Sequence, residues 1–471
     1  MTATPVDPTL FSGSDRRPVH FIGIAGAGMV GLAELAARRG VRITGSDTDP
    51  SGAEGLRAFG ADVGAGIDAR RIDGARAVVY SSAIPRDHAE LAAARAAGLP
   101  TVRRAEALGA LVATGRVVGI SGTHGKTTTT VMTTEALAAA GLAPTGIAGG
   151  RVEAWGSNVR TGADQWFVVE SDEYDRSFLA LTPDVAVVLN IEADHLDIYR
   201  DLADIHSAFA TFVAPARAIV LCADDAGAMA LPIGPGHDVL RYAIEGGPGE
   251  RDARVLATGV VTTPTHTRFD VRYDGETMGT VTLRVPGRHN VRNALAALAA
   301  GLACGARVAD MAPGLEAFGG VARRFQRLGS ARGVEVIDDY AHHPTEVTAT
   351  LEAARAAYPG RRIVVAFQPH LYSRTRDFAH AFGAALSAAD RLYLADLYPA
   401  REQPIPGVSS ALIAEAMRAS GQAPAWCGPR AILADALAAD ARDGDVVLTV
   451  GAGDITRTGP ELLARLGGET P

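Results

Sequence analysis

Residues 116–128 have the sequence Arg116-Val-Val-Gly-Ile-Ser-Gly-Thr-His-Gly-Lys-Thr-Thr128, an apolar strand pattern that runs into a loop bounded by glycines. A helical pattern follows, from Lys126 to about Ala140. A strand–loop–helix junction directs backbone N–H groups and the positive end of the helix at one point, so the loop is expected to bind phosphate. Lys126 would reach the terminal phosphates, and the Thr127 hydroxyl would bind Mg²⁺. The common pattern GxxxxGK[ST] has glycine where this chain has Ile120, so the loop is a variant.

Lys126 is also the only lysine of the chain, since 44 of the 45 basic residues are arginines. A compact ammonium fits between phosphoryl oxygens where a planar guanidinium does not. A phosphate-binding loop is therefore a place where lysine would be retained. Survival of one lysine by chance is the alternative, and it gives no reason for this position.

Bulk composition limits the possible functions. A net charge of −8 argues against a general nucleic-acid or membrane surface. Three cysteines without a CxxC pair favour a reducing compartment. The first 18 residues lack the features of a signal peptide, and the longest uncharged stretch of small apolar residues, between Arg292 and Arg307, spans 14 residues. We expect a cytoplasmic protein that is not inserted in a membrane and binds no nucleic acid.

Apolar β-branched segments alternate with alanine-rich helical patterns, which is typical of parallel α/β sheets. We predict three domains: Rossmann-like over residues 1–113, P-loop ATPase-like over 114–322, and Rossmann-like over 323–471. An alternating pattern with a turn at Asp274-Gly275 predicts a small antiparallel side sheet on the central domain. Strands are predicted at Val19–Ile24, Val41–Gly45, Ala77–Ser81, Arg116–Ser121, Trp166–Glu170, Val185–Asn190, Val334–Asp338, Ile363–Phe367, Arg391–Ala395 and Val446–Val450.

A second glycine motif, Gly26-Ala-Gly28-Met-Val-Gly31, stands between the first predicted strand and a helix. Asp47 follows Gly28 by 19 residues, as in dinucleotide-binding folds. The motif requires only a diphosphate at a helix N-terminus, which NAD and a UDP-sugar both supply. By itself it favours a dinucleotide.

Polar clusters follow several predicted strands, at the sheet edge where α/β proteins build their sites. Glu170 ends one strand and is placed like the metal-holding acid of phosphate-loop enzymes, and His195 lies in Asn190-Ile-Glu-Ala-Asp-His-Leu-Asp197. His195 is either a metal ligand or a solvated loop residue. In the C-terminal part, Asp338-Asp-Tyr-Ala-His-His-Pro-Thr-Glu346 and Phe367-Gln-Pro-His-Leu-Tyr-Ser-Arg-Thr375 bring three histidines and an arginine to two strand ends, which favours a shared site.

Taken together, these segments resemble the Mur ligases, the ATP-dependent enzymes that build the peptide of bacterial cell-wall precursors. The resemblance covers nearly the whole chain. It also includes Ser81-Ser-Ala-Ile84, Gly156-Ser-Asn158, Pro286-Gly-Arg-His-Asn290, Arg323-Arg-Phe325 and Gly451-Ala-Gly-Asp-Ile455. It implies three domains, for a UDP-sugar, for ATP and for an amino acid. It also implies ligation of L-alanine to UDP-N-acetylmuramate through an acyl phosphate, with ATP and Mg²⁺ as cofactors.

The resemblance also assigns roles to residues. ATP would be held by Gly122, Thr123, His124, Gly125, Lys126, Thr127, Thr128, Asn290, Asn293 and Arg324, and of these Asn290 and Asn293 would face the adenine. One Mg²⁺ would be held by Thr127 and Glu170, and a second by His195. The UDP portion would be held by Gly26, Ala27, Gly28, Met29, Asp47 and Ser82. L-Alanine and the acyl phosphate would be surrounded by Tyr340, His342, His370 and Arg374. The catalytic residues would be Lys126, His195, His343 and Arg374.

Lysine content bears on the branch of the family. Ligases for later amino acids use a second, carbamylated lysine near Mg²⁺, and this chain has no second lysine, so the alanine-adding branch is favoured. Two positions depart from the family pattern. Ile67 stands where a histidine is usual, and Leu371 stands where an arginine is frequent. We expect an altered uridine contact and one positive charge fewer near the amino-acid site.

Other functions remain open at this point. A sibling ligase that attaches a recycled peptide would share every phosphate residue. A nucleotide-sugar oxidoreductase would use Gly26–Gly31 and leave the lysine loop without a role, and a nucleotide-gated scaffold would bind ATP without turnover. The expected assembly is a monomer or a weak homodimer.

Overall fold

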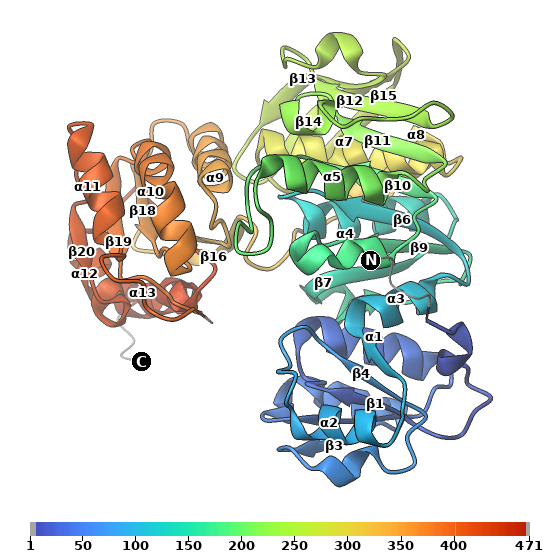
Figure 1. Cartoon of the computed structure of the whole chain (residues 1–471). Coiled ribbons are helices and arrows are strands. Elements are labelled where there is room, and N and C mark those ends of the chain that lie inside the picture. The colour runs from blue at the N-terminus through green and yellow to red at the C-terminus, as the bar shows by residue number, and fades with distance from the viewer. Residues whose placement is uncertain (1–5, 401, 468–471) are drawn as a thin grey trace. The chain divides into compact units, whose positions relative to one another are not determined.

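The computed structural model describes residues 6–400 and 402–467. The chain divides into two compact units. The first contains the described residues of Met1–Thr258, Asp270–Val281 and Arg292–Phe318, and the second those of Gly259–Phe269, Thr282–Val291 and Gly319–Pro471. Three β-sheets, each accompanied by helices, make up the fold (Figure 1). The predicted three-domain α/β architecture is therefore confirmed, while its boundaries stay a prediction.

The N-terminal sheet has five parallel strands in the order β3-β2-β1-β4-β5. The sequence predicted its three inner strands and missed the two short edge strands. The inner strand β1 is buried throughout and β2 and β4 are mostly buried, which is typical of a parallel sheet covered on both faces. The elements are β1 (Val19–Ile22), α1 (Ala27–Arg38), β2 (Ile43–Asp47), β3 (Asp62–Ala65), β4 (Ala77–Tyr80), α2 (Ala89–Ala96), β5 (Thr101–Arg103) and α3 (Arg104–Val112).

A buried network of polar side chains connects this sheet to α2. Glu90 and His20 are fully buried, with Glu90 Oε2 3.3 Å from the ring Nε2 of His20. Glu90 also accepts hydrogen bonds from the Ser46 hydroxyl and, at 2.9 Å, from the backbone N–H of Asp68. Burial opposes ionisation of Glu90, but the bonds from His20 and Ser46 outweigh it and lower the pKa of the carboxyl. The Glu90 carboxylate is thus hydrogen-bonded to groups on β1, on β2 and in the loop after β3.

Glu90→Ala is expected to lower the free energy of unfolding by about 3–5 kcal/mol, because His20 and Ser46 lose their buried partner. Since the folded-state pKa is depressed, this contribution is present above about pH 4.5 and is lost as pH falls through the lower folded value. Urea unfolding at pH 7 and at pH 3.5 measures both effects. Glu54→Ala, at an exposed position of the same domain, is the matched control. Equal stability of the two variants at pH 7 would contradict the network's role.

The central sheet has ten strands in the order β15-β14-β13-β12-β11-β10-β6-β9-β7-β8. The predicted antiparallel strands are present as one edge of this sheet, with Asp274-Gly275 at the turn between β14 and β15. Helix α4 packs on β7 and on α8. The strands are β6 (Arg116–Ser121), β7 (Thr145–Val152), β8 (Ser157–Arg160), β9 (Trp166–Glu170), β10 (Val185–Val188), β11 (Ala218–Cys222), β12 (Asp238–Ile244), β13 (Val255–Thr262), β14 (Thr267–Tyr273) and β15 (Glu276–Leu283). The helices are α4 (Lys126–Ala139), α5 (Leu202–Val213), α6 (Ala226–Met229), α7 (Arg288–Ala303) and α8 (Val308–Glu316).

The C-terminal sheet has six strands in the order β16-β17-β21-β18-β19-β20, and only β16 runs antiparallel to its neighbour. Four of these strands were predicted, and the edge strands β16 and β20 were not. The elements are β16 (Gln326–Ala331), β17 (Val334–Asp339), α9 (Pro344–Ala357), β18 (Ile363–Phe367), α10 (Tyr372–Leu386), β19 (Arg391–Ala395), α11 (Ala411–Ala419), β20 (Trp426–Gly428), α12 (Leu433–Asp440), β21 (Val446–Val450) and α13 (Thr458–Gly467). Across the described residues, no helix combines the length and apolar character needed to span a membrane.

Candidate functional site

The loop between β6 and α4 depends on two glycines. Gly122 and Gly125 have φ angles of 144° and 83°, in a region that residues with a side chain rarely adopt. A Cβ atom on Gly125 would also lie 2.7 Å from Oδ1 of Asn293. The loop is fixed from outside, because Asn190 Oδ1 accepts the backbone N–H of His124 at 2.7 Å. Since α4 begins at Lys126 with no side-chain cap, its first N–H groups remain directed into the loop, as predicted for a phosphate site.

The ammonium of Lys126 is held by groups of its own loop and by one acid. It donates to the carbonyl of Gly122 at 2.8 Å, to that of Thr123 at 3.2 Å, and to Glu173 Oε2 at 2.8 Å. Burial alone would lower the pKa of Lys126, but the carboxylates of Glu173 and Asp172 outweigh it and raise the pKa. The lysine is therefore charged, and it is positioned beside the open N–H groups of α4.

Thr127 and Glu170 form the second part of the site. The Thr127 hydroxyl donates to Glu170 Oε1 at 2.9 Å, and Glu170 Oε2 accepts the backbone N–H of Gly149 at 2.6 Å. Burial raises the pKa of the Glu170 carboxyl, against the Gly149 bond and the charge of Lys126. A hydroxyl and a carboxylate at this separation match the oxygen ligands that Mg²⁺ prefers. The structure thus brings together the two predicted metal ligands of the phosphate loop.

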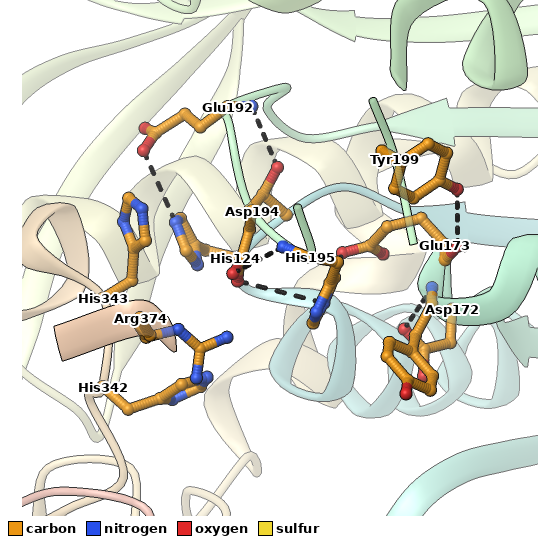
Figure 2. A network of polar contacts seen from close by, with 12 residues as sticks. His124, Asp172, Glu173, Glu192, Asp194, His195, Tyr199, His342, His343 and Arg374 are labelled. Carbon is orange, nitrogen blue, oxygen red and sulfur yellow. Dashed lines mark hydrogen bonds and ion pairs between the residues drawn. The ribbon is translucent and has the colours of Figure 1, made fainter. Parts of the chain in front are cut away.

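His195, the third predicted metal ligand, lies beside Glu173 (Figure 2). Its Nε2 is 3.6 Å from Glu173 Oε1 and 3.9 Å from Asp194 Oδ2. Its backbone has a φ of 54°, stabilised by a 2.8 Å bond from its N–H to Asp194 Oδ1. The ring also meets Tyr174 edge-on at 5.1 Å between centroids. The His195 ring is thus held between two acidic side chains, those of Glu173 and Asp194.

Glu173 received no role from the sequence, yet it connects Lys126 to His195. It is buried, and Tyr199 donates its hydroxyl proton to the Glu173 carbonyl at 2.6 Å (Figure 2). Burial raises the pKa of the Glu173 carboxyl to about 7, although the ammonium of Lys126 opposes the rise. Its position within Glu170-Ser-Asp-Glu-Tyr-Asp175 was the available signal, but three other acids in that segment share it.

The glycine motif at the start of α1 opens onto a cavity of about 290 Å³. Asp47 Oδ2 accepts the backbone N–H of Ala25 at 2.9 Å, so the predicted UDP-binding acid also shapes the turn before the helix. Ser81 lines the cavity, while the predicted Ser82 is exposed. Asn158, on β8, donates to the carbonyl of Ala27 at 2.8 Å and fixes the first turn of α1. Gly26, Ala27, Gly28 and Met29 all line the cavity, as do Glu170 and Asp172.

The two asparagines assigned to adenine have different surroundings. Asn293 is buried on α7 beside Gly125 of the phosphate loop. Asn290 is also buried, and its amide donates to the carbonyl of Pro286 at 2.7 Å. Asn290 thus has a clear local bond that holds the beginning of α7.

In the second compact unit, four of the predicted residues come together at the ends of β17 and β18. The His342 and His370 rings lie 6.1 Å apart, and Arg374 Nη1 is 3.5 Å from His370 Nδ1. The Tyr340 ring meets His342 edge-on at 5.2 Å. Leu371, which replaces the frequent arginine, has a φ of 70° directly before α10 and is nearly buried. The structure therefore brings these four side chains together within this unit, and their role as a shared site stays a prediction.

His343 and Arg324 lie next to this cluster. His343 is the N-cap of α9, where its ring Nδ1 accepts the N–H of Thr345 at 3.4 Å. Arg324 lies over the ring of Tyr340 at 5.1 Å and contacts Glu346 at 3.3 Å. Nearby, burial raises the pKa of Asp339 to about 6, against the charge of Arg324.

Sequence profiles of one family match the chain in consecutive segments. The profile "Mur ligase family, catalytic domain" matches residues 18–116, "Mur ligase middle domain" matches 120–301, and "Mur ligase, glutamate ligase domain" matches 323–453. Each segment contains one of the three sheets described above or most of it.

Several known proteins match this chain over nearly its full length. A UDP-N-acetylmuramate–L-alanine ligase of Streptomyces avermitilis is 47% identical over 452 residues, which are 95% of this chain and 97% of that protein. A crystal structure of UDP-N-acetylmuramate–alanine ligase from Thermotoga maritima has a TM-score of 0.78 at 26% identity, covering 96% of this chain and 99% of that one. A murein peptide ligase of Psychrobacter arcticus shares the fold, with a TM-score of 0.67 at 23% identity, covering 97% and 100%.

Proposed function

Because the chain belongs to the Mur ligase family, we propose that it joins L-alanine to the carboxylate of UDP-N-acetylmuramate at the expense of ATP. Full-length identity of 47% to a ligase of that name supports the substrates. The single observation that supports the chemistry best is the Lys126–Thr127–Glu170 arrangement on the loop before α4.

The reaction has to overcome the poor reactivity of a carboxylate. The muramoyl carboxylate oxygen attacks the γ-phosphorus of ATP, and the bond to ADP breaks. The amine of L-alanine then attacks the acyl carbon, loses a proton, and expels inorganic phosphate from a tetrahedral intermediate. Catalysis of this kind depends mainly on positioning and on neutralising charge.

The first unit would bind and activate the phosphates. Residues 122–128 would hold the triphosphate through backbone N–H groups and the Lys126 ammonium. Thr127 and Glu170, with His195, would hold Mg²⁺, which neutralises phosphate charge during transfer. Glu173 would keep Lys126 and His195 in place.

The other substrates would occupy the remaining sites. Gly26–Met29 and Asp47 would receive the UDP portion at the start of α1. Tyr340, His342, His370 and Arg374 would surround L-alanine and the acyl phosphate, with the guanidinium suited to an anionic oxygen.

Further parts of the proposal concern organisation. We place the domain boundaries at 113/114 and 322/323, and we expect a cytoplasmic monomer or weak homodimer. The lack of a second lysine supports the alanine-adding branch, because the carbamylated-lysine device of the later ligases has no residue to use.

Release of phosphate with UDP-N-acetylmuramate and a panel of amino acids tests the specificity. We expect kcat/KM for L-alanine to exceed that for glycine by about 10-fold or more, since one methyl group in a fitted pocket contributes that much. L-Serine and a tripeptide are the informative comparisons. Preference for the tripeptide would assign the chain to the sibling, peptide-adding activity, and reduction of NAD would indicate an oxidoreductase.

A further inference from the structure

The cavity at the start of α1 is lined by side chains of both charges. Glu170 and Asp172 line it on the side of the central sheet. Arg104 lines it on the side of the N-terminal sheet, together with the first turn of α1. No other residue of the lining is basic. A ligand that is anionic in its middle and reaches toward the phosphate loop would match this distribution.

Arg104 lies directly against the glycine motif. A Cβ atom added to Gly28 would lie 2.9 Å from Nη1 and 3.3 Å from Cζ of Arg104. The guanidinium therefore rests on the backbone of α1 where its first N–H groups begin. The contact is possible because residue 28 has no side chain.

Within the part of the chain that the structure describes, the Arg104 side chain makes no hydrogen bond or ion pair. The position of Arg104 in α3 does not stabilise its charge. Arg104 is the first residue of that helix, where the helix dipole disfavours a positive charge. The acid of the same helical turn, Glu106, accepts the backbone N–H of Arg103 at 2.8 Å. A half-buried arginine at the unfavourable end of a helix is a local cost, which a functional ligand would offset.

We propose that Arg104 binds the diphosphate of the nucleotide sugar, together with the N–H groups of α1. The inference rests on the proposed function and adds a residue to it. A guanidinium offers a planar pair of N–H donors that matches two phosphate oxygens, and the helix end adds partial positive charge from a second direction. Arg104 would thus set the register of the sugar nucleotide.

The lactyl carboxylate is the competing anion for Arg104. The cavity argues for the diphosphate, because Arg104 touches Gly28 at the helix end, whereas the reacting carboxylate has to approach the phosphate loop. Glu170, the acid that contacts Thr127 of that loop, belongs to the part of the lining that the central sheet supplies. Binding at Arg104 therefore leaves the distal end of the substrate free to reach the triphosphate.

Calorimetric titration without ATP tests the proposal with UDP-N-acetylmuramate, UDP-N-acetylglucosamine, UDP and UMP. Arg104→Ala is expected to weaken the first three by about 10- to 100-fold, and UMP by less, because UMP lacks the second phosphate. Arg104→Lys should recover part of the affinity by its charge alone. The KM for ATP is expected to stay unchanged.

Arg103→Ala removes the same charge from the neighbouring, exposed position outside the cavity and is the matched control. Gly28→Ala displaces the guanidinium without altering it and is expected to weaken UDP binding too. Wild-type affinity of Arg104→Ala for UDP would overturn the proposal, and so would a loss confined to the carboxylate-bearing sugar or an equal loss in Arg103→Ala. Failure of the wild-type protein to bind any UDP ligand would instead remove the proposed function itself.

Discussion

Lys126→Ala is expected to lower kcat for ligation by about 100- to 1,000-fold, while the Kd for UDP-N-acetylmuramate changes by less than about twofold. In the proposed mechanism the ammonium neutralises the terminal phosphates, and nothing in residues 122–128 replaces it. The proposed UDP site lies at the start of α1, which the substitution leaves intact. Initial rates of phosphate release and calorimetric titration of the sugar nucleotide measure the two quantities separately.

Lys126→Arg is the sharper variant. Arginine keeps the charge, but its planar group cannot converge on the two loop carbonyls and Glu173 as the ammonium does. We expect it to recover no more than about a tenth of the wild-type rate. Full activity of the arginine variant would show that charge alone suffices, and the retention of one lysine among 44 arginines would then have no physical explanation.

Folding has to be checked in both variants. Removing the ammonium leaves Glu173 buried without its cation, which costs stability unless the acid takes up a proton. Burial already raises the pKa of Glu173 to about 7, so protonation at neutral pH is accessible. Adding Glu173→Gln to Lys126→Ala should therefore restore thermal stability without restoring turnover.

Glu170→Gln is expected to lower kcat by about 100-fold and to raise the Mg²⁺ concentration needed for half-maximal rate. The Glu170 carboxylate accepts a hydrogen bond from the Thr127 hydroxyl of the phosphate loop. A neutral amide is a much weaker magnesium ligand than a carboxylate. Magnesium titrations of the initial rate are the measurement.

Glu153→Gln is the matched control, since Glu153 is an exposed acid in the same part of the chain. An unchanged magnesium dependence in Glu170→Gln would assign the carboxylate to loop structure, through Gly149 and Thr127, and not to the metal. Removal of divalent cations by a chelator should abolish turnover of the wild-type protein and be reversed by added Mg²⁺.

Much of the architecture was predictable because, in many inner strands, the apolar pattern of the local sequence agrees with burial in the folded sheet. Arg116–Ser121, Trp166–Glu170 and Val446–Val450 were predicted to the residue, since each has a mainly apolar centre that is buried on both faces. The short edge strands were missed, and so were the inner strands β7, β11 and β12 of the central sheet. β5 has three residues and β3 has a half-exposed, glycine-containing sequence, so neither has a period to detect.

The site was predictable where chemistry is local in the sequence, as in the phosphate loop. It was not predictable where the partner is remote, as for Glu173, which lies 47 residues from Lys126. Arg104, to which we assign a role in diphosphate binding, was missed for the same reason, because it lies beside Gly28, which is remote in the sequence. Isolated arginines in a chain with 44 of them carry no signal.

Because Lys126 is the only lysine of the chain and is mostly buried, proteolysis at this residue reports local unfolding at the beginning of α4. A protease specific for lysine has one cleavage site here, after Lys126. Cutting requires the first turn of α4 to unwind, because the side chain is 13% exposed and bonded to Glu173. The rate at which two fragments form, one ending at Lys126 and the other beginning at Thr127, therefore measures how often the first turn of α4 opens.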